Sequence, residues 1–475
     1  MPRADIDSIF NPKSVAIIGA SRQERRNGYQ VLKNIKDIGF TGKIFPINPK
    51  ADEILGFKVY KHIKEIGGDV DNAIIILPTN LVVQAVQDCV VKGVKSVIII
   101  TEGFAETGTD EGKILQQELK KIAKSNSIRI VGPGTMGVVN LPNFTSTYVN
   151  LGGLQQDGNL AFIAQSGIFA GGMVRYFASH DSKLSKIISL GNKIDVDDSD
   201  IIDYLAEDKQ TRVIALYMEG ISSVEKLIKS ARNFAINKGP IVLLKGGRTP
   251  EGARAARSHT SSLAVDDRIF EGIVRQTGMV RVESLDEFID TANAFTIYNG
   301  PVKGNRVAII TYSGALGVLS SDQCVRYGLQ LAKFSDETNA KIHEVVPDRK
   351  WGSNPIDTYP ATIKSGTQRT FTTCLEALMN DENVDCVLMT VWGDTHPDSH
   401  ENKYSMLVKN LVLKYQKTYQ KPAVMGVLGE KIGIERQKKF FRDNGIIALT
   451  FMDRAPKILM NMYRYYQFKS RYSNK

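Results

Sequence analysis

One histidine stands in a segment whose composition suits phosphate. The segment follows an expected strand and reads Gly246-Gly-Arg-Thr-Pro-Glu-Gly-Ala-Arg-Ala-Ala-Arg-Ser-His-Thr-Ser-Ser-Leu-Ala264, with three arginines before His259. Its small residues leave backbone room for a phosphate, and Arg254 and Arg257 supply counter-charge. Neutral imidazole is abundant near pH 7 and can take up a phosphoryl group as a nucleophile. We interpret the segment as a loop with a phosphorylatable histidine; a surface loop with an incidental histidine is the alternative.

A carboxylate is expected on the same side of the same domain. Glu219 ends the strand Arg212–Met218 in the run Leu216-Tyr-Met-Glu-Gly220. A carboxylate there can bind one imidazole nitrogen and leave the other as the attacking lone pair. The alternative is an exposed acid at the end of a strand.

Two Ser-Gly turns each join an expected strand to an expected helix. Ser166-Gly167 follows the strand Asn159–Ala164, and Ser313-Gly314 follows the strand Arg306–Thr311. Free backbone amides at the start of a helix bind anions. The pair predicts two helix N-termini that hold one phosphate from both sides, whereas ordinary capping of core helices is the alternative.

The first strand leads into a glycine turn that is typical of nucleotide sites. Ser14–Ile18 is followed by Gly19-Ala20-Ser21, but the G-x-G-x-x-G pattern of dinucleotide folds is missing. NAD requires an acid at the end of the second strand, and Lys50 is found there instead. A cation suits a ribose phosphate, so the pattern favours CoA over NAD. The loops with Thr101-Glu102 and Gly132–Gly137 follow strands of the same edge. The alternative is a plain turn at Gly19 and a solvated Lys50.

These residues require parallel sheets, and the sequence predicts an α/β fold. Short apolar runs alternate with helix-length amphipathic stretches along the whole chain, which indicates doubly wound sheets. The alternation restarts after turn-rich joints near residues 148 and 301. We expect three α/β domains, over residues 1–148, 149–300 and 301–475.

Composition limits the other possibilities. The net charge of +10 is spread over 475 residues without a basic arm, so no nucleic-acid partner is expected. Four cysteines without metal-ligand spacing predict reduced, mostly buried thiols and a cytoplasmic protein. No apolar run is long enough for a membrane helix, and no signal peptide is expected. A metal site at His396 and His400 is disfavoured by Pro397, so no metal is expected. The aromatic and basic C-terminus is expected to be a helix that covers the third sheet.

The motifs together resemble one family, the α subunit of ADP-forming acid–CoA ligases (NDP-forming acyl-CoA synthetases), which is related to succinyl-CoA ligase. The resemblance covers the whole chain in order, and the most specific match is the histidine segment. The matching stretches are Val15–Ser21, Pro46–Lys50, Glu102–Glu106, Gly132-Pro133 with Gly137, Gln165–Gly167 and Ser258–Ala264.

The resemblance implies a Rossmann-like CoA-binding domain followed by two flavodoxin-like ligase domains. It implies that His259 is phosphorylated, that Glu219 orients it, and that the two Ser-Gly turns bind the phosphate. CoA would be held by Gly19–Ser21, Lys50 and Thr101-Glu102. The implied substrates are an acyl-CoA or a small carboxylic acid, and phosphate. A separate ATP-grasp β subunit would hold ADP/ATP and Mg²⁺, which makes the protein a hetero-oligomer.

Three stretches depart from the family pattern: Gly134-Thr135-Met136, Val265, and Tyr312–Gly317. A non-catalytic CoA-binding regulatory subunit of the same superfamily is therefore the alternative function. An NAD-dependent dehydrogenase is a second alternative, disfavoured by the glycine pattern and by Lys50.

Overall fold

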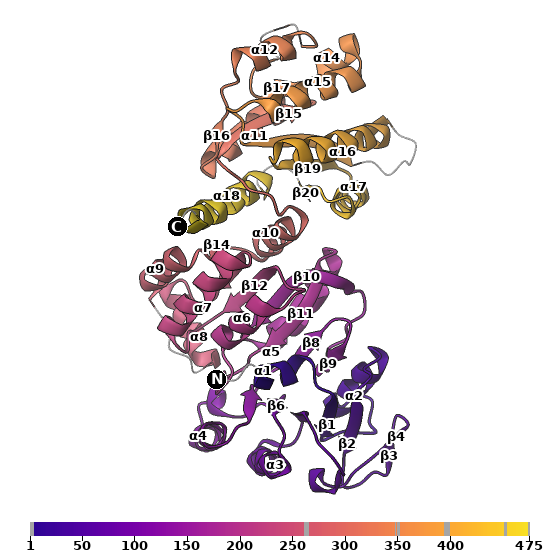
Figure 1. Cartoon of the computed structure of the whole chain (residues 1–475), viewed down its shortest axis with the longest axis vertical. Coiled ribbons are helices and arrows are strands. Elements are labelled where there is room, and N and C mark those ends of the chain that lie inside the picture. Colours follow the sequence, from indigo (N-terminus) through magenta and orange to yellow (C-terminus); the bar gives the residue numbers. More distant parts are fainter. Residues whose placement is uncertain are drawn as a thin grey trace. The chain divides into compact units, whose positions relative to one another are not determined.

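The computed structural model describes residues 4–260, 266–346, 348, 352–393, 400–450 and 454–473. It divides into two compact units, Met1–Glu283 and Ser284–Lys475. Figure 1 shows the chain coloured along the sequence, with labels on many of its helices and strands.

All strand pairs of the first sheet are parallel, and helices α2, α3 and α4 return the chain after β1, β5 and β6. Its order is β2-β1-β5-β6-β7, so the chain reverses its direction of winding between β1 and β5. The strands are β1 (Ser14–Ile18), β2 (Lys43–Ile47), β5 (Asn72–Ile75), β6 (Ser96–Ile99) and β7 (Arg129–Val131). The accompanying helices are α1 (Ala4–Phe10), α2 (Asn27–Asp37), α3 (Thr79–Lys92) and α4 (Asp110–Ser125), with short 3-10 turns at Ile63–Glu65 and Ala105–Thr107. A small hairpin of β3 (Glu53–Ile54) and β4 (Phe57–Lys58) follows β2.

The second sheet has the order β14-β13-β12-β10-β11-β8-β9. Strand β8 pairs antiparallel with both β11 and β9, and the other strand pairs are parallel. Its strands are β8 (Val138–Asn140), β9 (Phe144–Thr145), β10 (Gln155–Ala164), β11 (Lys183–Ser189), β12 (Val213–Met218), β13 (Ile241–Lys245) and β14 (Val280–Val282). Its helices are α5 (Gly167–Ser179), α6 (Asp198–Glu207), α7 (Val224–Asn237), α8 (Pro250–Thr260) and α9 (Asp267–Thr277). The sequence predicts that the first domain extends to residue 148. Strands β8 and β9 lie before that residue, yet they pair with the second sheet.

A shared core explains why the first two sheets form one unit. One cluster of buried apolar side chains runs from Ile17 of β1 to Ile163 of β10. Phe10 of α1 stacks on Tyr204 of α6, with ring centroids 4.9 Å apart. The Asn140 side chain donates to the Phe10 carbonyl at 3.0 Å. Burial of this surface fixes the two sheets relative to one another.

The second unit contains one parallel sheet of order β16-β15-β18-β19-β20, with β17 paired to β15. Its strands are β15 (Arg306–Thr311), β16 (Gln330–Leu331), β17 (Ile356–Asp357), β18 (Cys386–Gly393), β19 (Ala423–Gly429) and β20 (Ile447–Thr450). Its helices are α10 (Leu285–Ile297), α11 (Gly314–Arg326), α12 (Asp336–His343), α14 (Tyr359–Ser365), α15 (Thr367–Asn380), α16 (His400–Tyr419), α17 (Lys431–Asp443) and α18 (Arg454–Ser473). The final helix α18 contacts β18, β19 and β20, as the sequence predicts.

The predicted α/β class is confirmed, and so is the predicted burial of the free cysteines Cys89, Cys324, Cys374 and Cys386. The loop expected around His259 is wrong, because helix α8 continues to Thr260. Pro250 stands at the first helical position, where its fixed φ favours a helix start. The Thr249 hydroxyl accepts from the Gly252 amide at 3.1 Å, and the alanines that follow have high helix propensity.

Candidate functional site

A cavity of about 1160 Å³ opens at the carboxyl edge of the first sheet. Its wall contains the residues that follow β1, β2, β5 and β6, including Gly19-Ala20-Ser21 and Thr101-Glu102. The cavity lies where the winding reverses between β1 and β5, which is where open α/β sheets bind their ligands. The structure therefore brings these five predicted residues to one site.

The glycine turn of the cavity admits no side chain. Gly19 has φ +99°, and a Cβ built on it would lie 2.1 Å from the Ile76 carbonyl oxygen. A Cβ on Gly28, at the start of α2, would lie 2.1 Å from the Gly19 carbonyl oxygen. The two glycines thus let the turn pack directly against the end of β5 and the start of α2, and the turn residues lie in the cavity wall.

Replacing Gly28 with alanine is expected to destabilise the first unit by ~1–3 kcal/mol, because the new methyl group meets backbone that cannot move away. The Gly272→Ala variant is the matched control, since no heavy atom lies within 4 Å of a Cβ at that position in α9. The control should be stabilised by ~0.5–1 kcal/mol through its higher helix propensity. Urea unfolding measures both, and equal stability of the two variants would contradict the close packing at Gly28.

Lys50 is not among the residues that line the cavity. Its backbone amide donates to the Asn48 side chain at 2.8 Å, and its carbonyl accepts from Arg22 at 3.3 Å. The cationic side chains on the wall are Arg25, Arg26 and Lys61. Sequence reasoning missed these three. Lys61 reaches the cavity because the chain returns beside β2 after the small hairpin, with Ile47 bridged to Tyr60.

His62 and Asp88 form a second polar part of the wall. The Nε2 atom of His62 lies 3.0 Å from Asp88 Oδ2, and the Lys64 ammonium lies 2.7 Å from Asp88 Oδ1. Burial opposes ionisation of Asp88, but Lys64, Gln84 and His62 together hold the pKa of this carboxyl below its usual value. Asp88 is thus an anionic group at the cavity.

The carboxyl edges of the first two sheets meet at the loop Gly132–Gly137. The Gly134 amide donates to the Thr101 carbonyl at 3.0 Å, and the Asn192 amide donates to the Pro133 carbonyl at 3.0 Å. A Cβ on Gly167 would lie 3.1 Å from the Gly134 carbonyl oxygen. The cavity wall therefore continues to Ile168, in the first turn of α5.

The first turn of α5 is the predicted phosphate turn. Ser166 is the N-cap residue, but its side chain makes no capping hydrogen bond. Ser313 likewise precedes α11 without capping it, in the second unit. Both predicted Ser-Gly turns thus stand at helix starts whose serine hydroxyls do not occupy the first amides. That they hold one phosphate together remains a prediction.

Glu219 follows β12 and is 5% exposed, so the prediction of a strand-end acid is right, and the alternative of an exposed one is wrong. The Tyr217 hydroxyl donates to its carboxylate at 3.1 Å. Burial, and then the negative charge of Glu219, raise the pKa of Tyr217. The Gln165 side-chain oxygen accepts from the amides of Glu219 and Gly220, each at 3.0 Å. Gln165 directly precedes Ser166 in the sequence. Its side chain therefore links the backbone at Glu219 to the Ser166-Gly167 turn.

His259 lies in α8, one residue before its end. Its side chain and residues 261–265, Val265 included, lie outside the described part of the chain, as does His396. Its pairing with Glu219 stays a prediction.

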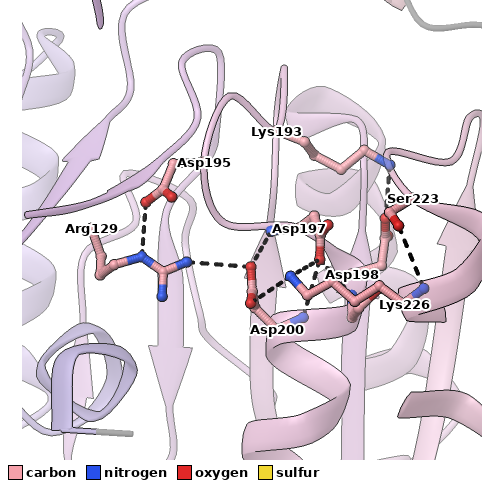
Figure 2. Close-up of polar contacts among 9 residues, drawn as sticks. Arg129, Lys193, Asp195, Asp197, Asp198, Asp200, Ser223 and Lys226 are labelled. Carbon is pink, nitrogen blue, oxygen red and sulfur yellow. Dashed lines mark hydrogen bonds and ion pairs between the residues drawn. The ribbon is translucent and has the colours of Figure 1, made fainter. Parts of the chain in front are cut away.

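A network of ion pairs surrounds the start of α6 (Figure 2). Arg129 of β7 binds Asp195 at 2.9 Å and Asp200 at 3.3 Å. Lys226 of α7 binds Asp200 at 2.7 Å, and Lys193 binds Asp198 at 2.8 Å. Sequence reasoning missed this network, although four aspartates within residues 195–200 were its visible signal.

Among the described residues, no group of three or more acidic, histidine or cysteine side chains could hold a metal ion. Within the same residues, no helix combines the length and the apolar character needed to cross a bilayer.

Three family models cover most of the chain. They describe a CoA binding domain over residues 13–140, a succinyl-CoA ligase like flavodoxin domain over 157–295 and a ligase-CoA domain over 307–472. The α subunit of Pyrococcus furiosus acetate–CoA ligase (ADP-forming) II is 38% identical, over 93% of each chain. This chain belongs to the ADP-forming acid–CoA ligase family.

Other members of the ADP-forming acid–CoA ligase family are also similar to this chain in sequence or in structure. Acetate–CoA ligase (ADP-forming) II of Archaeoglobus fulgidus is 39% identical over 97% of this chain and 67% of its own length. The dinucleotide-forming acetyl-coenzyme A synthetase 1 of Ca. Korarchaeum cryptofilum, solved with phosphate and ADP, superposes with a TM-score of 0.87 at 30% identity over 99% of both chains. The predicted resemblance, and with it the fold class of one CoA-binding and two ligase domains, is confirmed.

Proposed function

We propose that this chain is the α subunit of an ADP-forming acid–CoA ligase. It interconverts acyl-CoA, ADP and phosphate with free acid, CoA and ATP, through an acyl phosphate and a phosphohistidine. The observation that carries the proposal is the continuity of the cavity, which runs from the Gly19 turn to Ile168 beside the phosphate turn of α5. A ligand bound in the cavity can thus present its far end to a phosphate at Ser166-Gly167.

The cavity suits CoA by its chemistry. The Gly19-Ala20-Ser21 turn offers backbone to a pyrophosphate, and cationic side chains on the wall offer counter-charge to further phosphates. Thr101 and Glu102 lie in the cavity wall, and the Thr101 carbonyl accepts from Gly134, whose own carbonyl lies beside Gly167 of α5. In this proposal the thioester end of acyl-CoA lies at that side.

The reaction then takes three steps. A phosphate oxygen attacks the thioester carbonyl carbon, the carbon–sulfur bond breaks, and the CoA thiolate leaves and takes a proton. One imidazole nitrogen of His259 next attacks phosphorus, and the bond from phosphorus to the acyl oxygen breaks to release the carboxylate. Finally the terminal oxygen of ADP attacks phosphorus, which forms ATP and restores the imidazole.

The chain supplies positioning and charge stabilisation for these steps. Ser166-Gly167 and Ser313-Gly314 offer helix-start amides to the phosphate, and the helix dipoles favour its negative charge. Glu219 accepts the N–H of one imidazole nitrogen, which directs the lone pair of the other nitrogen to phosphorus.

ADP/ATP and Mg²⁺ bind a separate ATP-grasp β subunit in this proposal, so the working enzyme is a hetero-oligomer. The Pyrococcus furiosus relatives are named as α subunits, which supports a multi-subunit enzyme. Domain limits of 1–148, 149–300 and 301–475 and a cytoplasmic location belong to the same proposal, the latter supported by four buried free thiols.

The proposal is tested by labelling. The chain is incubated with a coexpressed ATP-grasp chain, acetyl-CoA and radioactive phosphate, and the protein is analysed for acid-labile, base-stable label. We expect label on His259 that ADP removes as ATP. An unlabelled chain that still binds CoA would contradict the proposal and favour the non-catalytic regulatory subunit.

The cations that serve the 3′-phosphate of CoA can be identified by calorimetry. We expect Lys61→Glu to lower the affinity for CoA roughly 10-fold and the affinity for dephospho-CoA much less. The reason is that the new carboxylate repels the 3′-phosphate, which only CoA carries. Lys50→Glu is the comparison, and a selective loss there would favour the position predicted from the sequence. Equal losses for both ligands in both variants would contradict a contact between either lysine and that phosphate. NAD should not bind.

A further inference from the structure

The peptide that follows Glu219 is held from both sides. The Gly220 amide donates to the Gln165 side-chain oxygen at 3.0 Å. The Lys193 ammonium donates to the Gly220 carbonyl oxygen at 2.8 Å. Since the Glu219 amide also donates to Gln165, three hydrogen bonds fix the backbone from which the Glu219 side chain leaves.

Lys193 occupies an unfavourable position for a lysine. Its φ of +50° lies in the left-handed region, where a side chain other than glycine costs about 1 kcal/mol or more. Its side chain is only 4% exposed and pairs with the 3% exposed side chain of Asp198 at 2.8 Å. The attraction within a buried ion pair seldom exceeds the cost of removing both charges from water. Stability alone therefore gives no reason for a lysine at this position.

The pair is anchored in a rigid frame. Asp198 is the first residue of α6, whose N-cap Asp197 forms a capping box with Asp200. Asp200 binds Lys226 of α7 and Arg129 of β7, and these two cations approach α6 from different elements (Figure 2). The adjacent Asn192 side chain donates to Gln116 at 2.9 Å, on the first sheet's helix α4. The Lys193 ammonium is thus held by Asp198 and Gly220, and the neighbouring Asn192 ties this segment to α4.

We propose that Lys193 is a positioning residue for Glu219. Its ammonium holds the Gly220 carbonyl and, together with Gln165, fixes the direction in which the Glu219 carboxylate points. The inference rests on the proposed function, in which Glu219 orients His259. Loss of Lys193 leaves the CoA cavity intact but lets the carboxylate sample unproductive orientations, so phosphoryl transfer slows while CoA binding stays.

The test compares two lysines. Lys193→Met removes the ammonium and keeps an apolar stem. Lys186→Met is the matched control, because the Lys186 side chain is also buried, at 5% exposed, and also pairs with an aspartate, Asp208, at 2.8 Å in the same unit. Asp198→Asn is a second variant that keeps the lysine and the packing volume. Each is measured for CoA affinity, for the rate of phosphate labelling with the ATP-grasp chain present, and for hydrogen exchange of the Glu219 and Gly220 amides.

We expect Lys193→Met to slow labelling roughly 10- to 100-fold, as a small misplacement of a catalytic group does, with unchanged CoA affinity and faster exchange at Gly220. Lys186→Met should change neither. Asp198→Asn should show a smaller loss in the same direction, and it carries the test if Lys193→Met does not fold. Wild-type labelling and exchange in both Lys193→Met and Asp198→Asn would overturn the inference.

Glu219→Gln separates this inference from the function on which it rests. Slow labelling in Glu219→Gln with normal labelling in Lys193→Met would overturn the positioning role alone. Normal labelling in Glu219→Gln would overturn the proposed role of Glu219, and the faster exchange at Gly220 in Lys193→Met would then report a purely structural contact.

Discussion

Replacing His259 with alanine is expected to abolish phosphate labelling and to lower turnover by at least about 10³-fold. The reason is covalent: without the imidazole, the phosphoryl group has no acceptor between the acyl phosphate and ADP, and direct transfer would require both sites to meet. Labelling is measured after incubation with acetyl-CoA and radioactive phosphate, and turnover by ATP formation in the presence of the ATP-grasp chain.

His180→Ala is the control for this experiment. His180 is the C-cap residue of α5 in the same unit, and its Nδ1 atom lies 2.9 Å from the Tyr176 carbonyl oxygen. This variant should be labelled like the wild type. Label that persists in His259→Ala would place the phosphoryl group on another residue and contradict the proposed relay, whereas equal loss in both variants would indicate a general effect of the substitutions.

The sheets were predictable because burial fixes their sequence pattern. Strands β1 (Ser14–Ile18) and β15 (Arg306–Thr311) have the bounds expected from their apolar runs. A strand buried on both faces must be apolar along its whole length, so its ends are visible in the sequence. The strands β8 and β9 were not predicted, since each is too short for such a pattern and depends on pairing with β11.

Helix α8 was misjudged from its composition. Glycine and arginine around His259 favoured a phosphate-binding loop, but Pro250 and the alanines between the arginines favour a helix. Local propensity outweighed the analogy with glycine-rich loops. The position of the histidine after a strand of the second sheet was nevertheless correct.

The parts of the site that sequence could not predict depend on contacts between distant residues. Lys61 lines the cavity because the β3–β4 hairpin returns the chain beside β2. Arg129 donates a hydrogen bond to Asp195, which lies 66 residues away in the sequence. Nothing in the sequence around Lys193 distinguishes it from a surface lysine. Only the folded chain brings its ammonium to the carbonyl of Gly220. Spacing along the chain carries no signal for such contacts.

Replacing Glu219 with glutamine is expected to slow the phosphorylation of His259 by roughly 10²- to 10⁴-fold, the usual contribution of a positioned acid–base group. Glutamine keeps the volume of the side chain and a hydrogen bond with Tyr217, but it has no negative charge to stabilise the imidazole as it takes up phosphorus. The loss should appear in the rate of labelling and leave the affinity for CoA unchanged, because Glu219 is not among the residues of the cavity wall.

Two further variants serve as comparisons for the labelling rate of Glu219→Gln. Tyr217→Phe removes only the hydroxyl that donates to Glu219, so it should slow labelling by about 10-fold, close to the value of one hydrogen bond to a charged group. Glu225→Gln removes an exposed carboxylate from the first turn of α7 and should have no effect. If the carboxylate acts directly on the histidine, the rate of labelling should be lowest in Glu219→Gln, intermediate in Tyr217→Phe and highest in Glu225→Gln. A Tyr217→Phe variant slower than Glu219→Gln would instead make the tyrosine hydroxyl the group that acts on the phosphoryl transfer.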